Sequence, residues 1–303
     1  MTTRRSHFYG AFWYRLHIFA VRRLPAWVIR VLLPFFATLV FVLGGSMRRA
    51  IARNLDAALG RVGPWRRWRR VWRNMTTWAW CATERYESLS GHRPVICEVP
   101  EGLETWREIL DRGDGFILAT AHLGHWESGS LFPAGEHGRR VVHVVREEEM
   151  EPEAQRVFEE FLSQTDDTTY KVHFAHRNPT LGQKLLVALR RGEVVALQAD
   201  RPATGGRSIE VELFGRPFAV PIGPMMMARA AGAPILPAFL YRVGRSRAMP
   251  VFRPPIWVEP TDDREGDLRR AAQALVAEVE AAILRDPMQW FCVRDLWPKE
   301  EAA

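Results

Sequence analysis

Two hydrophobic patterns divide the chain near residue 90. Beyond residue 100, short apolar runs alternate with amphipathic stretches. Continuous apolar runs of four to eight residues, bounded by turn residues, are typical of strands buried on both faces of a sheet. Four runs fit this description, at residues 115–121, 141–145, 194–198 and 235–241.

Amphipathic segments between and after these runs predict helices. One of them begins at Trp126. The others cover residues 152–162, 180–190, 223–231 and 267–284, and the last ends before Pro287. Alternation of strand and helix predicts an α/β fold with a mostly parallel central sheet flanked by helices. Residues 207–213 and 216–220, joined at Phe214 and Gly215, predict a hairpin inserted into that sheet.

The first 90 residues follow the other pattern, that of an apolar and basic helical region. Residues 31–47 are uncharged and lie between Arg30 and Arg48. As a helix this run would extend ~25 Å, slightly less than the ~30 Å hydrocarbon core of a bilayer, and Pro34 interrupts it early. A retained anchor or an interfacial helix fits better than a cleaved signal peptide, because arginines break up the preceding segment. We expect residues 1–90 to anchor an α/β domain of residues 91–303 to a membrane, by spanning the bilayer or by lying within it.

Charge supports the membrane interpretation. Residues 1–85 carry 16 arginines, no lysine and two acidic residues, for a net charge of +14, whereas the remainder carries −7. A segment of this charge attracts polyanions, either nucleic acid or an anionic membrane surface. Residues 64–73 alternate tryptophan with arginine, two side chains suited to the headgroup layer, although a solvated helix with its tryptophans in the core has the same pattern. No motif for reading nucleic acid accompanies the charge, so we expect no nucleic-acid partner.

Composition adds two limits. With 303 residues, of which 47% are hydrophobic and 25% charged, the chain can bury one large core with a helical appendage. Its three cysteines, Cys81, Cys97 and Cys292, form neither a disulfide framework nor a zinc signature, which indicates a reducing cytoplasmic setting for the folded part.

The candidate chemistry lies directly after the first predicted strand. His122 follows that strand and Glu127 comes five residues later, where ligands usually bind in an open α/β sheet. A carboxylate within reach of the imidazole would fix its tautomer and raise its basicity, leaving the other ring nitrogen to take a proton from a hydroxyl. Gly124 would let the loop turn tightly and bring backbone N–H groups to a developing oxyanion.

These residues resemble a family. His122, Gly124, Trp126 and Glu127 resemble the His-x4-acid motif of the lysophospholipid and lipid A late acyltransferases. Three further segments agree in order. They are VVHVVR, which ends at Arg146, the segment that begins with LQADRPATGG and ends with FLYR, and the closing DPMQWFCVRDLW. The pair alone is a weak signal, but four ordered segments over nearly the whole chain are a strong one.

The resemblance implies transfer of a fatty acyl group from an acyl carrier protein or coenzyme A thioester to a hydroxyl of a membrane lipid or glycolipid, such as a lipid A precursor. By this analogy His122 is the general base and Glu127 its orienting partner, with no metal and no cofactor beyond the thioester co-substrate. Arg146 and Asp200 match positions expected to serve substrate binding, as do Gly124, His125 and Trp126 in the motif loop. His125 stands where the family commonly has asparagine, which points to a changed hydrogen bond or a contact with the acceptor headgroup. The expected location is the cytoplasmic face of a bacterial inner membrane.

Two other hypotheses stay open at this point. His122, His125 and Glu127 form an HxxHxE pattern that could hold the metal of a lipid hydrolase. The +14 segment could instead belong to a membrane or nucleic-acid adaptor without catalytic activity.

Overall fold

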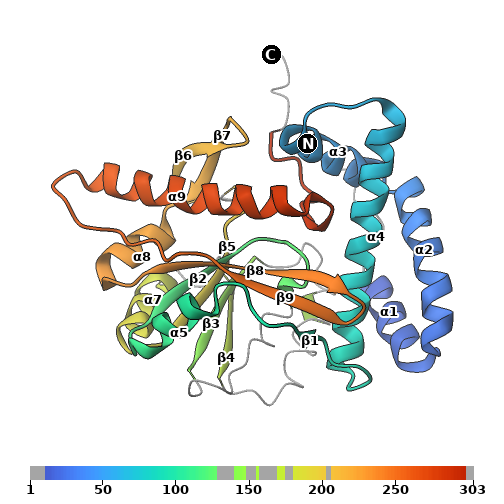
Figure 1. Cartoon of the computed structure of the whole chain (residues 1–303), viewed down its shortest axis with the longest axis horizontal. Coiled ribbons are helices and arrows are strands. Elements are labelled where there is room, and N and C mark those ends of the chain that lie inside the picture. Colours follow the sequence, from blue (N-terminus) through green and yellow to red (C-terminus); the bar gives the residue numbers. More distant parts are fainter. Residues whose placement is uncertain are drawn as a thin grey trace.

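The computed structural model describes residues 11–127, 140–147, 155–156, 169–174, 180–202 and 206–297. In this part of the chain an α/β domain carries its sheet in the centre, and four amino-terminal helices stand against one side of it (Figure 1). The predicted fold class is confirmed: the sheet is mostly parallel and helices flank it.

The central sheet has seven described strands in the order β1-β9-β8-β2-β5-β3-β4. All neighbouring pairs are parallel except β8 and β9, which are antiparallel. The strands are β1 (Ile96–Cys97), β2 (Phe116–Thr120), β3 (Val142–Arg146), β4 (Tyr170–Phe174), β5 (Val194–Gln198), β8 (Ile235–Gly244) and β9 (Arg247–Phe252). The four predicted runs became β2, β3, β5 and β8, whereas β1, β4 and β9 were not predicted.

The central strands are buried on both faces, because each face has its own helices. In β2, Ile117 and Ala119 belong to the larger core, which includes residues of α7, α8 and α9, whereas Phe116 belongs to a smaller core with α5. The covering helices are α5 (Leu103–Asp111), α7 (Leu181–Arg190), α8 (Gly223–Ala231) and α9 (Arg264–Arg285). This double covering explains why the strands read as apolar runs without alternation.

The final helix, α9, is longer than the predicted 267–284. Asp263 precedes it, and its side chain accepts a hydrogen bond from the backbone of Gly266 at 2.9 Å. That bond satisfies one of the open donors at the helix start, and Glu265 lies favourably in the first turn. A short 3-10 turn, η3 (Pro287–Gln289), follows α9 and leads the chain back toward the site.

The hairpin prediction was half right. Strands β6 (Ser208–Leu213) and β7 (Arg216–Pro221) pair antiparallel across Phe214 and Gly215. They form a separate two-stranded sheet, however, and are not inserted into the central one. The reason is their alternating burial: the buried side of β6 packs beside α9, and the other side remains exposed.

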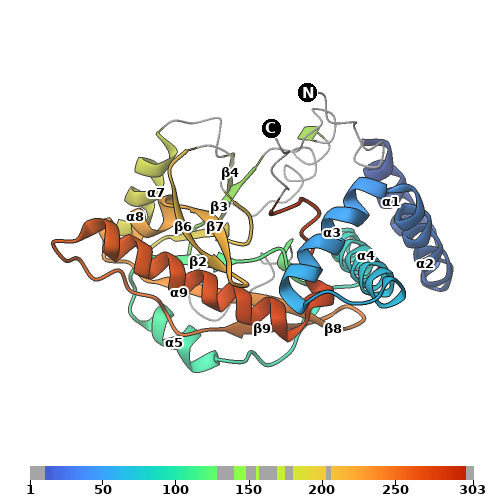
Figure 2. The same ribbon diagram turned by 90° about the horizontal axis from the view of Figure 1, so that it is seen from above.

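The amino-terminal region is helical, as predicted. Its helices are α1 (Ala11–Arg23), α2 (Ala26–Leu43), α3 (Gly45–Leu59) and α4 (Pro64–Leu89). Viewed from above, α4 lies between α2 and the α/β domain (Figure 2). The division of the chain into domains at residues 1–90 and 91–303 remains a prediction.

Helix α2 differs from the predicted apolar run at both ends. It begins at Ala26, continues through Pro34, and ends before Gly44, so that Met47 belongs to α3. Packing against α4 offsets the hydrogen bond that the proline removes. In the described residues α2 is the one helix long and apolar enough to cross a membrane. Its mean hydropathy is 2.3, and 17% of the helix is buried.

Two predicted helices fall largely outside the described residues. Trp126 and Glu127 begin a short 3-10 turn, after which the helix expected from Trp126 onward leaves the described part of the chain. Of the predicted helix at 152–162, Gln155 and Arg156 are described and are helical. The segments 180–190 and 223–231 are confirmed as α7 and α8.

Candidate active site

Three neighbouring parallel strands bring polar residues to one edge of the sheet. β2 ends two residues before His122, β5 ends two residues before Asp200, and β3 ends at Arg146 itself. Thr120 and Gln198 are register partners, so His122 and Asp200 leave the sheet at equal distances from an aligned pair. Carboxyl ends of parallel strands are where an open α/β sheet binds its ligands.

His122 and Asp200 form a buried hydrogen-bonded pair. The imidazole Nδ1 lies 2.7 Å from Oδ1 of Asp200, and the indole Nε1 of Trp290 donates to Oδ2 at 2.9 Å. Asp200 is fully buried, whereas the His122 side chain keeps 11% of its surface exposed. With Nδ1 committed to the carboxylate as donor, Nε2 carries the lone pair, which is the arrangement that a general base requires.

Burial and charge set the protonation states of this pair. Burial lowers the pKa of His122 below its ordinary 6.5, although the Asp200 carboxylate acts in the opposite direction. Burial would raise the pKa of Asp200, but the charge and hydrogen bond of His122 outweigh it and bring that pKa to about 2. At neutral pH the pair is therefore a neutral imidazole beside an ionised carboxylate.

The expected hydrogen bond between His122 and Glu127 is replaced by the one to Asp200. Glu127 is instead held by two arginines: Nη1 of Arg85 lies 2.6 Å from Oε2, and Nη2 of Arg146 lies 3.4 Å from Oε1. Burial would raise the pKa of Glu127, but the charges of Arg85 and then Arg146 outweigh it, so the carboxylate is ionised. The physical reason for the difference is reach, because the loop turns after His122 and directs Glu127 toward α4. The catalytic roles of His122 and Glu127 remain predictions.

Gly124 makes the loop turn, as expected, but does not leave its N–H group free. Its φ is +58°, and a Cβ there would lie 2.2 Å from the carbonyl oxygen of Leu240. Its N–H donates to the carbonyl of Gln289, and that of His125 donates to Leu240. These two groups support the loop and are not available to the expected oxyanion.

His125 points away from His122 and toward α4. Its side chain is fully buried, with Nε2 lying 3.0 Å from a carboxylate oxygen of Glu84. Glu84 also receives two hydrogen bonds from Arg242, at 2.8 and 3.0 Å. His125, which stands where the family commonly has asparagine, thus packs against α4, and its contact with the acceptor headgroup remains a prediction.

Trp126 and Arg146 line the other side of the imidazole. The ring of Trp126 meets that of His122 edge-on at 4.6 Å between centroids, and the Arg146 guanidinium lies 5.7 Å from the centroid of the same indole. A pocket opens between this loop and α4, with Trp78 and Arg85 on the α4 wall and Trp126 and Glu127 opposite. The predicted residues Gly124, His125 and Trp126 thus line this pocket, and Trp126 also contacts His122.

The proposed metal ligands do not converge. His122 pairs with Asp200, His125 with Glu84, and Glu127 with Arg85 and Arg146. Among the described residues no three His, Cys, Asp or Glu side chains are placed to hold one ion. HxxHxE is therefore not assembled as a ligand set.

Sequence reasoning missed the residues that α4 contributes. Glu84 and Asp56 are the two acidic residues of the basic segment, and each is paired with an arginine, Glu84 with Arg242 and Asp56 with Arg67. An isolated acid in such a segment was a usable signal for a long-range ion pair. Arg85 carried no such signal, because it is one arginine among many. Trp290 appeared in the closing segment without an assigned partner.

Comparison of the sequence with known proteins assigns the chain to a family. A family model described as bacterial lipid A biosynthesis acyltransferase matches residues 2–299. Phosphatidylinositol mannoside acyltransferase of Mycobacterium tuberculosis (strain H37Rv) is 27% identical over 199 residues, which cover 65% of this chain and 58% of that protein. The Mycolicibacterium smegmatis protein of the same name is 26% identical over 189 residues, 62% of this chain and 58% of its own length. The chain thus matches little more than half the length of these relatives. Because the family model spans nearly the whole chain, the chain belongs to the bacterial lipid A biosynthesis acyltransferase family, whose members are enzymes that transfer acyl groups.

Proposed function

We propose that the chain transfers a fatty acyl group from an acyl thioester to a hydroxyl of a membrane glycolipid, with His122 as the general base. The observation that carries the proposal is the His122–Asp200 pair at the carboxyl edge of the sheet, in a chain of an acyltransferase family. Acyl carrier protein or coenzyme A would carry the thioester.

The geometry supports a direct transfer. Nε2 of His122 takes the proton of the acceptor hydroxyl while its oxygen attacks the thioester carbonyl. The new C–O bond forms, the C–S bond breaks, and the proton passes from the imidazolium to the leaving thiolate. Asp200 keeps the imidazole in the correct tautomer and stabilises the imidazolium that forms.

Glu127 supports this step without touching Nδ1. Its ionised carboxylate gathers Arg85 and Arg146 beside the imidazole. Arg146, 15% exposed, would bind an anionic part of a substrate, and Glu127 would hold its guanidinium in place.

A glycolipid acceptor is supported by the names of the relatives, which act on phosphatidylinositol mannoside. A lipid A precursor, the acceptor expected from the sequence, belongs to the same class of phosphorylated glycolipid. The family is membrane-associated, and α2 with the basic amino-terminal region would hold the site at the cytoplasmic face of an inner membrane.

The test uses the purified full chain, liposomes that contain an acceptor glycolipid, and an isotope-labelled acyl thioester. Mass spectrometry should detect one added labelled chain in an ester bond, with acyl carrier protein and coenzyme A thioesters assayed separately. Lipid A precursors and mannosylated phosphatidylinositols serve as parallel acceptors. His122→Gln should lower the rate by at least ~10³-fold, as expected for loss of a general base.

Folding is checked by thermal melting of each variant. A His122→Gln protein that folds and transfers acyl chains at the wild-type rate would remove the proposed mechanism. A wild-type chain that transfers none to either acceptor class, with either thioester, would remove the proposed function.

A further inference from the structure

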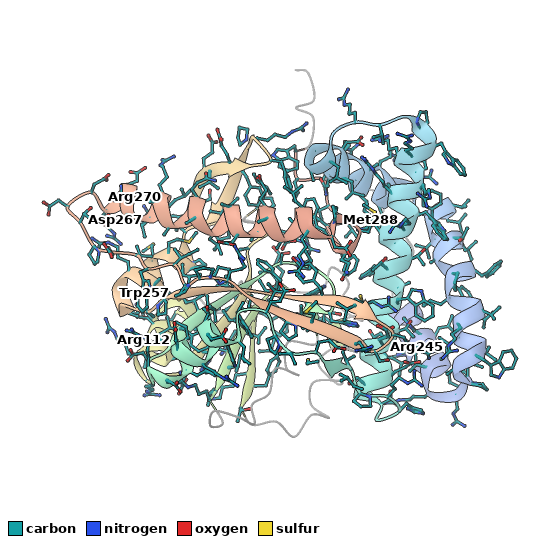
Figure 3. The ribbon with its side chains drawn as sticks, viewed as in Figure 1. Arg112, Arg245, Trp257, Asp267, Arg270 and Met288 are labelled. Carbon is teal, nitrogen blue, oxygen red and sulfur yellow. The ribbon has the colours of Figure 1, made fainter. Side chains whose placement is uncertain are left out.

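Helix α4, which the sequence assigns to the membrane-anchoring region, contacts the active-site frame at three points. Asn74 donates to the carbonyl oxygens of Met288 and Trp290, at 3.1 and 2.7 Å, and Trp290 in turn holds Asp200. Glu84 lies against His125, and Arg85 binds Glu127. Asn74, Glu84 and Arg85 thus connect α4 both to the segment that holds Asp200 and to the loop that carries Glu127. Met288 lies beside α4 in Figure 3.

The Arg85–Glu127 contact is the most direct of the three. It joins Nη1 to Oε2 at 2.6 Å, with 13% and 24% of the two side chains exposed, whereas Arg146 reaches the other oxygen at 3.4 Å. Charge-assisted bonds of this length between partly buried groups are among the strong interactions of proteins. Arg85 is therefore the nearer of the two cations that hold the Glu127 carboxylate.

Further ion pairs hold the carboxyl-terminal half of α4 against the α/β domain. Arg242 of β8 binds Glu84, and Arg245, labelled in Figure 3 at the end of the β8–β9 hairpin, binds Glu87 at 3.2 Å. Asn54 of α3 also donates to the carbonyls of Cys292 and Arg294 in the closing segment. Buried polar contacts thus hold the helical region against the α/β domain. An appendage joined only by a linker would lack such contacts.

The opposite side of α4 carries α2. The indole of Trp72 donates to the hydroxyl of Thr38 at 3.0 Å, and the rings of Phe41 and Trp68 meet edge-on. The outward side of α2 exposes large apolar side chains, among them Trp27 at 68% and Phe35 at 64%. Helix α4 therefore lies between the apolar face of α2 and the loop that carries Glu127 (Figure 1).

We propose that Arg85 is a positioning residue of the active site, holding the Glu127 carboxylate beside His122, and that residues 1–90 complete the site besides anchoring it. This inference rests on the proposed acyl transfer. Its consequence is that a change on α4 alters the chemical step even when the protein still binds membranes.

The test compares Arg85→Gln, Arg85→Lys and Glu127→Gln in the full chain, using the liposome assay. Arg107→Gln on α5 is the matched control, because it removes the same charge from an exposed arginine away from the site. Arg85→Gln should lower kcat ~10- to 100-fold with unchanged co-sedimentation with liposomes, and Arg85→Lys should recover part of the rate. Arg107→Gln should match the wild type.

Two readouts separate positioning from mere folding. The first is pH: the charged and titratable groups facing Glu127 are Arg85, Arg146, His122 and Cys81. Since Arg85 is the strongest of the influences that lower the pKa of Glu127, its removal raises that pKa. The acid step of kcat that Glu127 sets, which is separate from that of His122, should move to higher pH in Arg85→Gln and return toward the wild-type position in Arg85→Lys.

The second readout is the double variant Arg85→Gln/Glu127→Gln. If Arg85 acts through Glu127, the double variant should have the rate of Glu127→Gln alone. Independent, multiplied losses, or a wild-type rate and pH profile in Arg85→Gln, would overturn the inference. If Arg85→Gln does not melt cooperatively, the pH profile of Arg85→Lys decides, and a profile identical to that of Arg107→Gln counts against positioning. A wild-type chain without acyl transfer would refute the proposed function instead.

Discussion

Asp200 and Trp290 control how basic and how well oriented the imidazole of His122 is. Burial lowers the pKa of His122, and the carboxylate of Asp200 opposes that effect. Trp290 occupies the second carboxylate oxygen, so Asp200 has one oxygen left for the imidazole. The pair is therefore set up to keep His122 neutral at pH 7 and ready to take a proton.

Asp200→Asn should damage catalysis strongly and shift its pH dependence downward. Without the carboxylate the pKa of His122 falls further, and the amide can no longer fix the donor at Nδ1. We expect kcat/KM to drop ~10²- to 10⁴-fold, by analogy with the loss of the carboxylate from a hydrolase triad. The acid limb of kcat/KM, which lies below pH 6.5 in the wild type because of the lowered pKa, should move to lower pH still. Both effects can be measured by steady-state kinetics from pH 4.5 to pH 8, in steps of about half a pH unit. A limb that moves upward, or a wild-type rate, would contradict the assigned pair.

Gly124 is the residue at which the loop geometry can be tested by stability alone. Gly124→Ala places a Cβ 2.2 Å from the Leu240 carbonyl oxygen at a φ of +58°. Strain at such a position costs on the order of 1–3 kcal/mol, and the overlap with backbone adds to it. Thermal melting should therefore show a lower Tm. Gly182→Ala is the matched control: a Cβ at this position in α7 meets nothing within 4 Å, so its Tm should be unchanged or slightly higher. Equal melting temperatures for Gly124→Ala and the wild type would contradict the turn.

Among the elements, α2 is the one whose surface is least suited to water. Large apolar side chains on its outward side are mostly exposed, including Trp27, Val31, Phe35 and Val42. They are four, four and seven residues apart, so they form one stripe along the helix. A stripe of this kind next to arginines is typical of a face that contacts anionic lipid.

Replacing two residues of that stripe should weaken membrane binding. Val31→Glu/Phe35→Glu puts two charges on the outward face of α2 and removes its apolar contact with lipid. We expect the partition coefficient on anionic liposomes to fall at least ~tenfold, with further loss at high salt. Val187→Glu, at a 44% exposed apolar residue of α7, is the control and should sediment with liposomes like the wild type. Unchanged co-sedimentation of the double variant would contradict a lipid-facing α2.

Elements with a clear hydrophobic or turn signal were predictable, whereas β1, β4 and β9 were not. β2 and β5 are covered on both faces, so their apolar runs were visible in the sequence. β9 contains Pro250, which argues locally against a strand, and it forms because β8 and β1 supply partners on both sides. The same tertiary support lets α2 continue through Pro34.

At the scale of the whole molecule, the site is assembled from residues far apart in the chain. His122 follows β2, Asp200 follows β5, and Arg85 comes from α4. The sequence singled out His122, Glu127 and Asp200, because all three lie in recognisable segments, and their catalytic roles remain predictions. It favoured Glu127 over Asp200 as the partner of the imidazole, because Glu127 is nearer in the sequence. The alignment of β2 with β5, which brings Asp200 to Nδ1, is not visible along the chain.

The division of charge gains a second meaning at this scale. The +14 region is expected to attract an anionic membrane, but Arg85 within it binds the partly buried carboxylate of Glu127 at the border between helices and sheet. The basic region is thus partly structural, and its contacts reach the pair that we assign to catalysis.

The most direct test of acyl transfer by His122 is mass spectrometry of the lipids of cells that carry, lack or express a variant of this chain. Loss of the gene should leave one glycolipid species short of one acyl chain; the wild-type chain should restore it, and His122→Gln, expressed at the same level, should not. A lipid profile unchanged by loss of the gene, or full restoration by His122→Gln, would contradict the account.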